Sequence, residues 1–131
     1  MKLYHFAPTY LLEGIQKNGL TKGTFPVIRK YGPMRLLGPC QWMTNDMDFN
    51  NQSWATTREL IDYDRNDVRL MISIPKSSRI RLVRACDFIK GFPEDSRHIV
   101  TDWPGSEHWY LYLGNIPSGW IREIVLKEDE P

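Results

Sequence analysis

The segment from Val68 to Ile74 constrains the fold of this chain more than any other segment does. Every second residue in it is Val, Leu or Ile, and Pro75 follows. A period of two is typical of a β-strand that buries one face, and proline ends such a strand because it has no N–H group for the ladder. A strand with one apolar face must pair with other strands and have that face covered. The chain is therefore expected to build a sheet with other elements packed on it.

Further strands are predicted where aromatic and β-branched residues cluster. They lie at residues 3–6, 40–44, 108–113 and 120–126, with weaker candidates at 25–28 and 80–83. The connection at 114–119 predicts that the last two strands form a hairpin or strand pair. The strands at 3–6, 68–74 and 108–113 lie away from any long crossover helix, so we predict that they belong to one largely antiparallel system.

The clearest helical pattern follows the first strand. Leu11, Leu12 and Ile15 fall on one helical face, and Asn18-Gly19 supplies a left-handed stop. A second helix is predicted to begin at Asp46 or Asp48, either of which can cap it, and to run to residue 61. Shorter helical segments are predicted at 85–89 and 94–99.

Length and composition fit one small α+β domain with two main helices on short, mostly antiparallel strands. The chain has 131 residues, of which 41% are hydrophobic, enough to bury one core. We expect a single domain over residues 1–126 and an acidic, frayed tail over 127–131.

Charge and cysteine content exclude several classes of protein. Seventeen Lys and Arg stand against 16 Asp and Glu, which argues against a protein that coats nucleic acid by charge alone. Two cysteines are too few for a disulfide scaffold and lack zinc-site spacing, so a reduced, cytoplasmic location is expected. No apolar run approaches the roughly 18 residues of a membrane span, so no membrane association is expected.

Motif searches remove other possibilities. The chain has no glycine-rich phosphate loop and no paired histidine spacing, so neither a Rossmann nucleotide site nor a metal site is predicted. The basic run from Lys76 to Lys90 has two interpretations: a solvated strand edge, which we favour, or a patch that faces phosphate or nucleic acid.

Three separate segments combine into an informative order. His5 lies between aromatic residues in the first strand, which leads into the helix and Gly19-Leu20. Trp42 lies in a second short strand, and Glu107 directly precedes the predicted aromatic strand at 108–113. This order resembles the ADP-ribosyltransferase superfold, especially its diphtheria-toxin-like and poly(ADP-ribose) polymerase branch. The resemblance covers the two ends of the chain. Phe6 stands where that branch often has glycine, and Trp42 where it usually has tyrosine.

The resemblance implies NAD as a substrate and assigns roles to particular residues. Cleavage of the bond between nicotinamide and ribose develops oxocarbenium-like charge on the sugar, and Glu107 would be the catalytic carboxylate that stabilises it. The imidazole of His5 would fix the other ribose, and aromatic faces would stack on nicotinamide. The NAD-binding residues implied are His5, Phe6, Trp42, Thr44 and Asn45.

Each of these residues also has a structural interpretation. His5 fits equally well as a core histidine bonded to a carbonyl group, and Glu107 as an exposed carboxylate at a strand start. For Trp42 a core position is favoured over a ligand platform. The implied function is a toxin- or effector-type ADP-ribosyltransferase that modifies a macromolecule, with protein favoured over nucleic acid as acceptor. Two alternatives stay open: an inactive binding or inhibitory module on the same fold, or an enzyme similar to RNA 2′-phosphotransferases.

Overall fold

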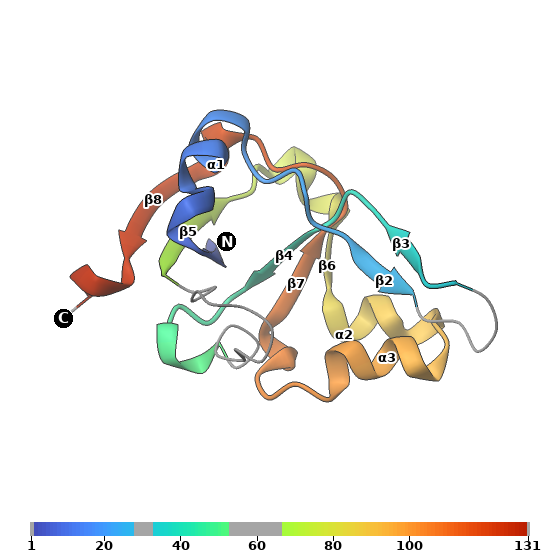
Figure 1. Cartoon of the computed structure of the whole chain (residues 1–131). Helices are drawn as coiled ribbons and strands as arrows, with labels where there is room; N and C mark the ends of the chain where they lie inside the picture. Colours follow the sequence, from blue (N-terminus) through green and yellow to red (C-terminus); the bar gives the residue numbers. More distant parts are fainter. Residues whose placement is uncertain (1, 28–32, 53–66, 131) are drawn as a thin grey trace.

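The computed structural model describes residues 2–27, 33–52 and 67–130. Its centre is a six-stranded sheet with the strand order β6-β7-β4-β1-β5-β8, in which every neighbouring pair is antiparallel (Figure 1). The strands are β1 (Lys2–Ala7), β4 (Gln41–Thr44), β5 (Val68–Ser73), β6 (Leu82–Arg84), β7 (Trp109–Tyr112) and β8 (Ile121–Leu126). The predicted α+β class and the antiparallel system that contains β1, β5 and β7 are confirmed.

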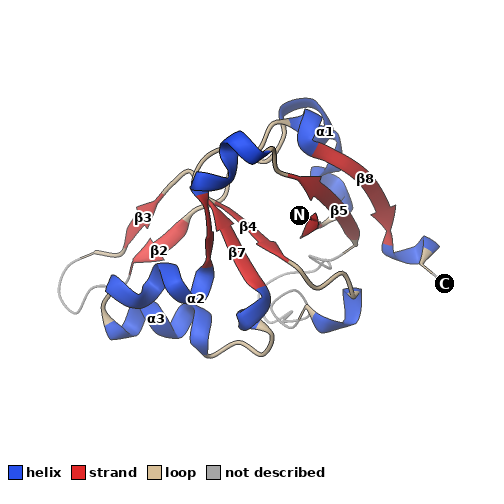
Figure 2. Ribbon diagram, turned by 180° about the vertical axis from the view of Figure 1, so that it is seen from behind, coloured by secondary structure: helices blue, strands red, loops and turns tan. Residues whose placement is uncertain are grey.

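Helices and a separate hairpin pack around this sheet. The helices are α1 (Leu12–Asn18), α2 (Ala85–Phe88) and α3 (Glu94–Thr101), and the hairpin joins β2 (Phe25–Val27) to β3 (Arg35–Leu37). Short 3₁₀ turns occupy Thr9–Leu11, Phe49–Asn51, Lys76–Arg81, Ile89–Gly91, Ser106–His108, Ser118–Trp120 and Lys127–Asp129. Figure 2 shows α1 at one end of the sheet and α2 and α3 at the other.

The sheet consists of two halves that meet at a single paired position. Strands β1, β5 and β8 form one half and β4, β6 and β7 the other, and the two halves join where Tyr4 of β1 pairs with Thr44 of β4. Within each half the pairing is longer, for example from Lys2 to Ala7 along β5. The boundary between the halves therefore leaves backbone groups of β4 to be satisfied by something other than a ladder.

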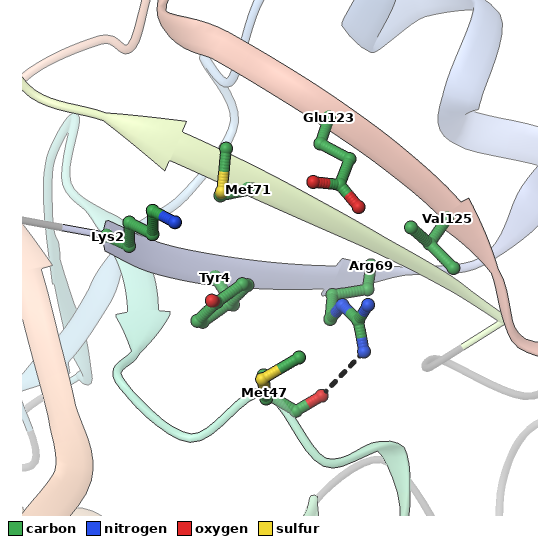
Figure 3. A pocket seen from close by; sticks show the side chains of 7 residues that line it. All are labelled: Lys2, Tyr4, Met47, Arg69, Met71, Glu123 and Val125. Carbon is green, nitrogen blue, oxygen red and sulfur yellow. Dashed lines mark hydrogen bonds between the residues drawn. The ribbon is translucent and has the colours of Figure 1, made fainter. Parts of the chain in front are cut away.

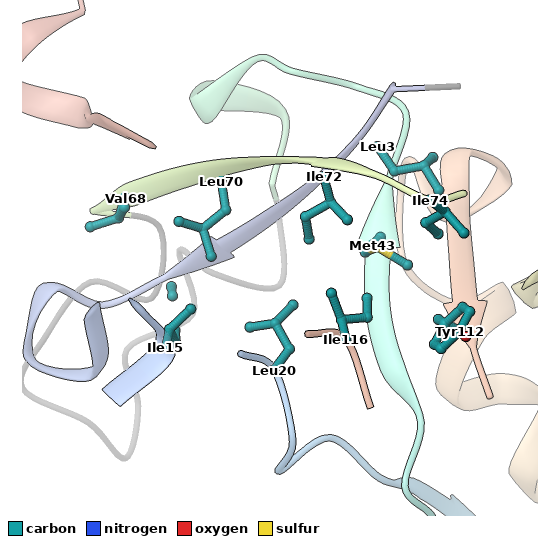
Figure 4. Close-up of a cluster of buried hydrophobic side chains, with 11 residues drawn as sticks. Leu3, Ile15, Leu20, Met43, Val68, Leu70, Ile72, Ile74, Tyr112 and Ile116 are labelled. Carbon is teal, nitrogen blue, oxygen red and sulfur yellow. The ribbon is translucent and has the colours of Figure 1, made fainter. Parts of the chain in front are cut away.

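Alternation along β1 and β5 separates a pocket-bearing face from a core face. Tyr4 and Arg69 belong to the first face (Figure 3), whereas Leu3 and Leu70 belong to the second (Figure 4). The core face is covered by α1 and by the bridge between Leu20 and Ile116. Its buried residues are Leu3, Ala7, Ile15, Leu20, Met43, Val68, Leu70, Ile72, Ile74, Tyr112 and Ile116.

A second buried cluster lies over the other half of the sheet, on the face opposite α1. Helices α2 and α3 cover β7 there, and the hairpin contributes Phe25. Its buried members are Phe25, Cys40, Ala85, Ile89, Val100, Trp109 and Leu111. The two halves of the sheet thus have their helices on opposite faces.

The predicted hairpin between the last two strands is wrong. Strand β7 lies between β6 and β4, whereas β8 is an edge strand beyond β5. The connection between them does not turn back on itself, because Ile116 pairs with Leu20 and a 3₁₀ turn over Ser118–Trp120 redirects the chain. Trp120 then packs edge-on against Tyr112.

Three other expectations need adjustment. The strand predicted at 80–83 begins at Leu82, because Lys76–Arg81 forms a 3₁₀ helix. Asp48 does cap a turn, by accepting a hydrogen bond from the Asn50 N–H, but the rest of the helix predicted to residue 61 lies outside the described residues. In the segment expected to form an acidic tail, the Lys127 N–H donates to the Asp67 carbonyl, and Lys127–Asp129 forms a 3₁₀ turn.

Candidate functional site

His5 fills the place where the two halves of the sheet separate. Its Nδ1 lies 2.7 Å from the carbonyl oxygen of Trp42 on β4. A carbonyl oxygen only accepts hydrogen bonds, so Nδ1 carries the proton and Nε2 of the neutral ring is an acceptor. The contact satisfies a β4 carbonyl at the boundary, which agrees with the structural interpretation of a histidine bonded to a carbonyl and leaves Nε2 for a further partner.

Burial lowers the pKa of His5, because the charged ring loses its hydration, while the bond to the Trp42 carbonyl acts in the opposite direction. The folded chain therefore binds fewer protons at His5 than the unfolded chain does when the pH falls below the unfolded pKa of about 6.5. We expect the free energy of unfolding to decrease as the pH falls through this value, and to be fully retained above it.

Urea unfolding at about pH 7.5 and about pH 5.5, compared between wild type and His5→Asn, tests this expectation. The Asn amide can keep a donor near the position of Nδ1 but does not titrate, so the variant is expected to lose less stability on acidification. His98, whose pKa is raised by its hydrogen bond to Asp102, is present in both proteins and cancels. Equal losses in the two proteins would contradict a lowered pKa for His5.

Trp42 lies on the opposite face of the sheet from the His5 side chain. Its indole Nε1–H donates to the Thr24 carbonyl at 2.9 Å. One ring face stacks on Phe25 at 5.4 Å with an interplanar angle of 13°, and Trp109 approaches edge-on at 5.8 Å. The stacking surface expected for nicotinamide is thus engaged by the protein's own aromatic cluster.

The other implied contact residues lie on the same face as Trp42 or at the end of its strand. Phe6 is buried and packs edge-on against Phe49 at 5.2 Å. Thr44 is buried, and its hydroxyl accepts from the Asp46 N–H at 3.1 Å. Asn45 is exposed and donates its backbone N–H to His108 at 3.0 Å. The turn after β4 is therefore ordered by its own side chains and joined to the start of β7.

Glu107 stands in the 3₁₀ turn that opens β7, with its side chain 68% exposed. Its backbone carbonyl accepts from Arg84 Nη2 at 2.9 Å, and its Oε1 lies 3.7 Å from His108 Nε2. Arg84 thus holds the backbone of Glu107, while the carboxylate itself lies at the surface. Within the described residues, no hydrogen bond or ion pair joins Glu107 to His5 or Trp42, although their strands are neighbours.

Sequence reasoning missed one feature, a pocket on the face of β1, β5 and β8 that carries Tyr4 and Phe6. Arg69 is one of its lining side chains. The signal in the sequence was a cation at a position within a strand whose alternate residues are all apolar. A charged residue in a strand interior requires a partner, and the pattern alone does not reveal which one.

The described residues offer neither a metal site nor a membrane-spanning helix. In the described ranges, no three His, Cys, Asp or Glu side chains gather as metal ligands, and no helix is long and apolar enough to cross a bilayer. Protein-family models, curated proteins and solved structures show no match to this chain.

Proposed function

We propose that this chain is an NAD-dependent ADP-ribosyltransferase that modifies a macromolecular acceptor. The observation that carries the proposal is the adjacency of β1, β4 and β7 in the sheet. These are the strands of the three segments on which the resemblance rests, with His5 on the first, Trp42 on the second and Glu107 at the start of the third. Segments far apart in the sequence thus supply neighbouring strands, although the side chains of His5 and Trp42 project from opposite faces of the sheet.

The state of His5 supports a binding role in such a site. Its Nδ1–H is fixed by the Trp42 carbonyl, so the ring orientation and the tautomer are both set. No described residue hydrogen-bonds to Nε2, which is therefore an acceptor for a donor such as a ribose hydroxyl. A histidine held in this way keeps its orientation without the substrate.

Glu107 would act on the reacting sugar. Its carboxylate accepts a hydrogen bond from a ribose hydroxyl and stabilises positive charge as the bond between nicotinamide nitrogen and the anomeric carbon breaks. Nicotinamide leaves with the bonding electron pair and is neutral. A nucleophilic atom of the acceptor then bonds to the anomeric carbon and loses its proton to solvent or a nearby base. The exposed position of Glu107 suits an acceptor as large as a protein.

One observation favours a second candidate, an inactive module of the same fold. Trp42 stacks on Phe25, and its indole N–H donates to the Thr24 carbonyl. The aromatic side chain that would hold nicotinamide is therefore already in contact with other residues of the protein. Such a module would bind a partner without cleaving NAD.

Incubation of the chain with NAD labelled in the ADP-ribose portion and a cell lysate tests both candidates. We expect label in the protein fraction and free nicotinamide in equal amount. Label in nucleic acid alone would contradict a protein acceptor. A thermal shift with NAD but no nicotinamide release would favour the inactive module, because a ligand that binds the native state raises its apparent stability without turnover. The absence of both a thermal shift and nicotinamide release would refute NAD as the ligand.

A further inference from the structure

The pocket lies on the face of β1, β5 and β8 that carries Tyr4 and Arg69, and the alternation of side chains along these three neighbouring strands builds it. Pairing aligns Tyr4 with Met71 and Arg69 with Val125, so their side chains project together from one face. Met47 closes the side toward the turn after β4 (Figure 3). The seven lining residues are Lys2, Tyr4, Met47, Arg69, Met71, Glu123 and Val125. The volume is about 220 Å³, below the roughly 300 Å³ or more of pockets for drug-sized ligands, so the pocket suits a small molecule or group.

Arg69 is the buried one of the three charged residues that line this pocket. Its side chain is only 7% exposed. Nη1 donates to the Met47 carbonyl at 3.0 Å and approaches Glu130 at 3.4 Å. The guanidinium also lies over the rings of Phe49 and Tyr4, at 5.1 and 5.8 Å from their centroids. The aromatic and backbone contacts fix its plane.

The hydrogen-bonding capacity of Arg69 is not exhausted by these contacts. A guanidinium carries five N–H groups in a planar fork, and no described residue accepts a hydrogen bond from Nε or Nη2. Buried donors without acceptors are costly, and the fork matches the two oxygens of a carboxylate or a phosphate. The buried, oriented guanidinium therefore presents donors that an oxyanion would satisfy.

The remaining pocket residues define what else a ligand must carry. Lys2 adds a second cation at the exposed end, and Glu123 adds an acceptor on the β8 side. Tyr4, Met47 and Met71 supply apolar and polarisable walls. A ligand with an oxyanion and a hydroxyl or ammonium group would match both signs of charge.

We propose that this pocket binds a small oxyanion-bearing molecule, a carboxylate or a phosphate, through Arg69, and that Glu130 competes with it. Glu130 already places a carboxylate on Nη1, but at a long 3.4 Å and with 38% of its side chain exposed. The Glu130 carboxylate is the exposed partner of this pair and can turn toward solvent, whereas its negative charge beside the guanidinium repels a second oxyanion. Residues 127–130 thus act as an internal competitor of the ligand. The inference is independent of NAD chemistry.

Titration calorimetry of the whole chain with inorganic phosphate and with acetate, at constant ionic strength, tests this inference. Glu130→Gln removes the competitor, and we expect it to bind the preferred anion about two- to fivefold more tightly than wild type. Glu128→Gln is the matched control, because it makes the same change of charge in the 3₁₀ turn that precedes Glu130, and no described contact joins Glu128 to Arg69. Tighter binding of phosphate than of acetate would assign the site to phosphate esters, and the reverse order to carboxylic acids.

Two further variants connect binding to the pocket. Arg69→Lys keeps the charge but removes the fork and is expected to weaken the preferred anion at least tenfold; its fold is checked by circular dichroism and urea unfolding. Lys2→Met removes the second cation of the pocket at an exposed position and is expected to weaken binding severalfold. This variant keeps the inference testable if Arg69→Lys does not fold. The inference is overturned if millimolar phosphate and acetate both fail to bind wild type and Glu130→Gln, if Glu128→Gln matches Glu130→Gln, or if folded Arg69→Lys and Lys2→Met both bind as wild type does.

Discussion

Glu107→Gln is expected to lower the rate of NAD cleavage by about 10²- to 10³-fold, equivalent to roughly 3 to 4 kcal/mol of transition-state stabilisation. The amide keeps the size of the side chain and part of its hydrogen bonding but not its charge. Positive charge develops on the ribose only as the bond to nicotinamide breaks, so the lost interaction belongs to the transition state. The affinity for NAD is therefore expected to stay close to that of wild type.

Single-turnover rates and NAD titrations on folded protein measure the two quantities separately. The substitution should leave the fold intact, because the Glu107 side chain is 68% exposed and the backbone carbonyl, which it does not alter, holds the contact to Arg84. Glu13→Gln, at an exposed position in the first turn of α1, makes the same chemical change away from β7 and is expected to be fully active. Wild-type turnover in Glu107→Gln would remove this residue from the proposed mechanism.

Local signals explain why much of the sheet could be predicted. The alternation from Val68 onward reports directly on burial of one face, since successive side chains point to opposite sides of a strand. The stop at Gly19 is equally local, because a helix end depends on a few consecutive residues. These signals need no knowledge of the partner strands, and the structure confirms both.

Partner choice is where prediction from the sequence failed. A hairpin of the last two strands would need only a short loop. Instead, Ile116 in the connection pairs with Leu20, and the chain continues to Ile121, which pairs with β5. That bridge joins residues far apart in the sequence, so no local sequence pattern predicts it. The order of strands therefore depends on contacts between surfaces that only the folded chain brings together.

The candidate site shows the same division. His5 and Glu107 were found from residue order, but the bond from His5 to the Trp42 carbonyl exists because β1 and β4 separate beyond one paired position. The Arg69 pocket needs three strands in register and residues 127–130 beside them. Sequence patterns suggest candidate residues such as His5 and Glu107, whereas the contacts that these residues make are set by strand register.

Gly19→Ala is expected to destabilise the fold by about 3 kcal/mol or more, the largest effect on stability foreseen for a single methyl group in this chain. Gly19 ends α1 with φ 77° and ψ −163°, a backbone region open essentially to glycine alone. A Cβ there would also overlap the Ile116 carbonyl oxygen and lie 2.8 Å from the Ser118 nitrogen. These Ile116 and Ser118 atoms belong to the backbone, which cannot move aside as the end of a flexible side chain would. The bridge between Leu20 and Ile116 must therefore open.

Urea unfolding of Gly19→Ala beside Gly14→Ala measures this cost with a matched control. Gly14 lies within α1, and a Cβ added to it meets no atom within 4 Å. Alanine there is expected to stabilise the chain by roughly 0.5 to 1 kcal/mol, because it restricts the unfolded backbone and favours helix. The two substitutions add the same methyl group to sites five residues apart, so their opposite signs would isolate conformation and close backbone approach as the cause. Similar small effects at both positions would mean that α1 is not anchored through Gly19, and the bridge that separates β8 from β7 would lose its structural basis.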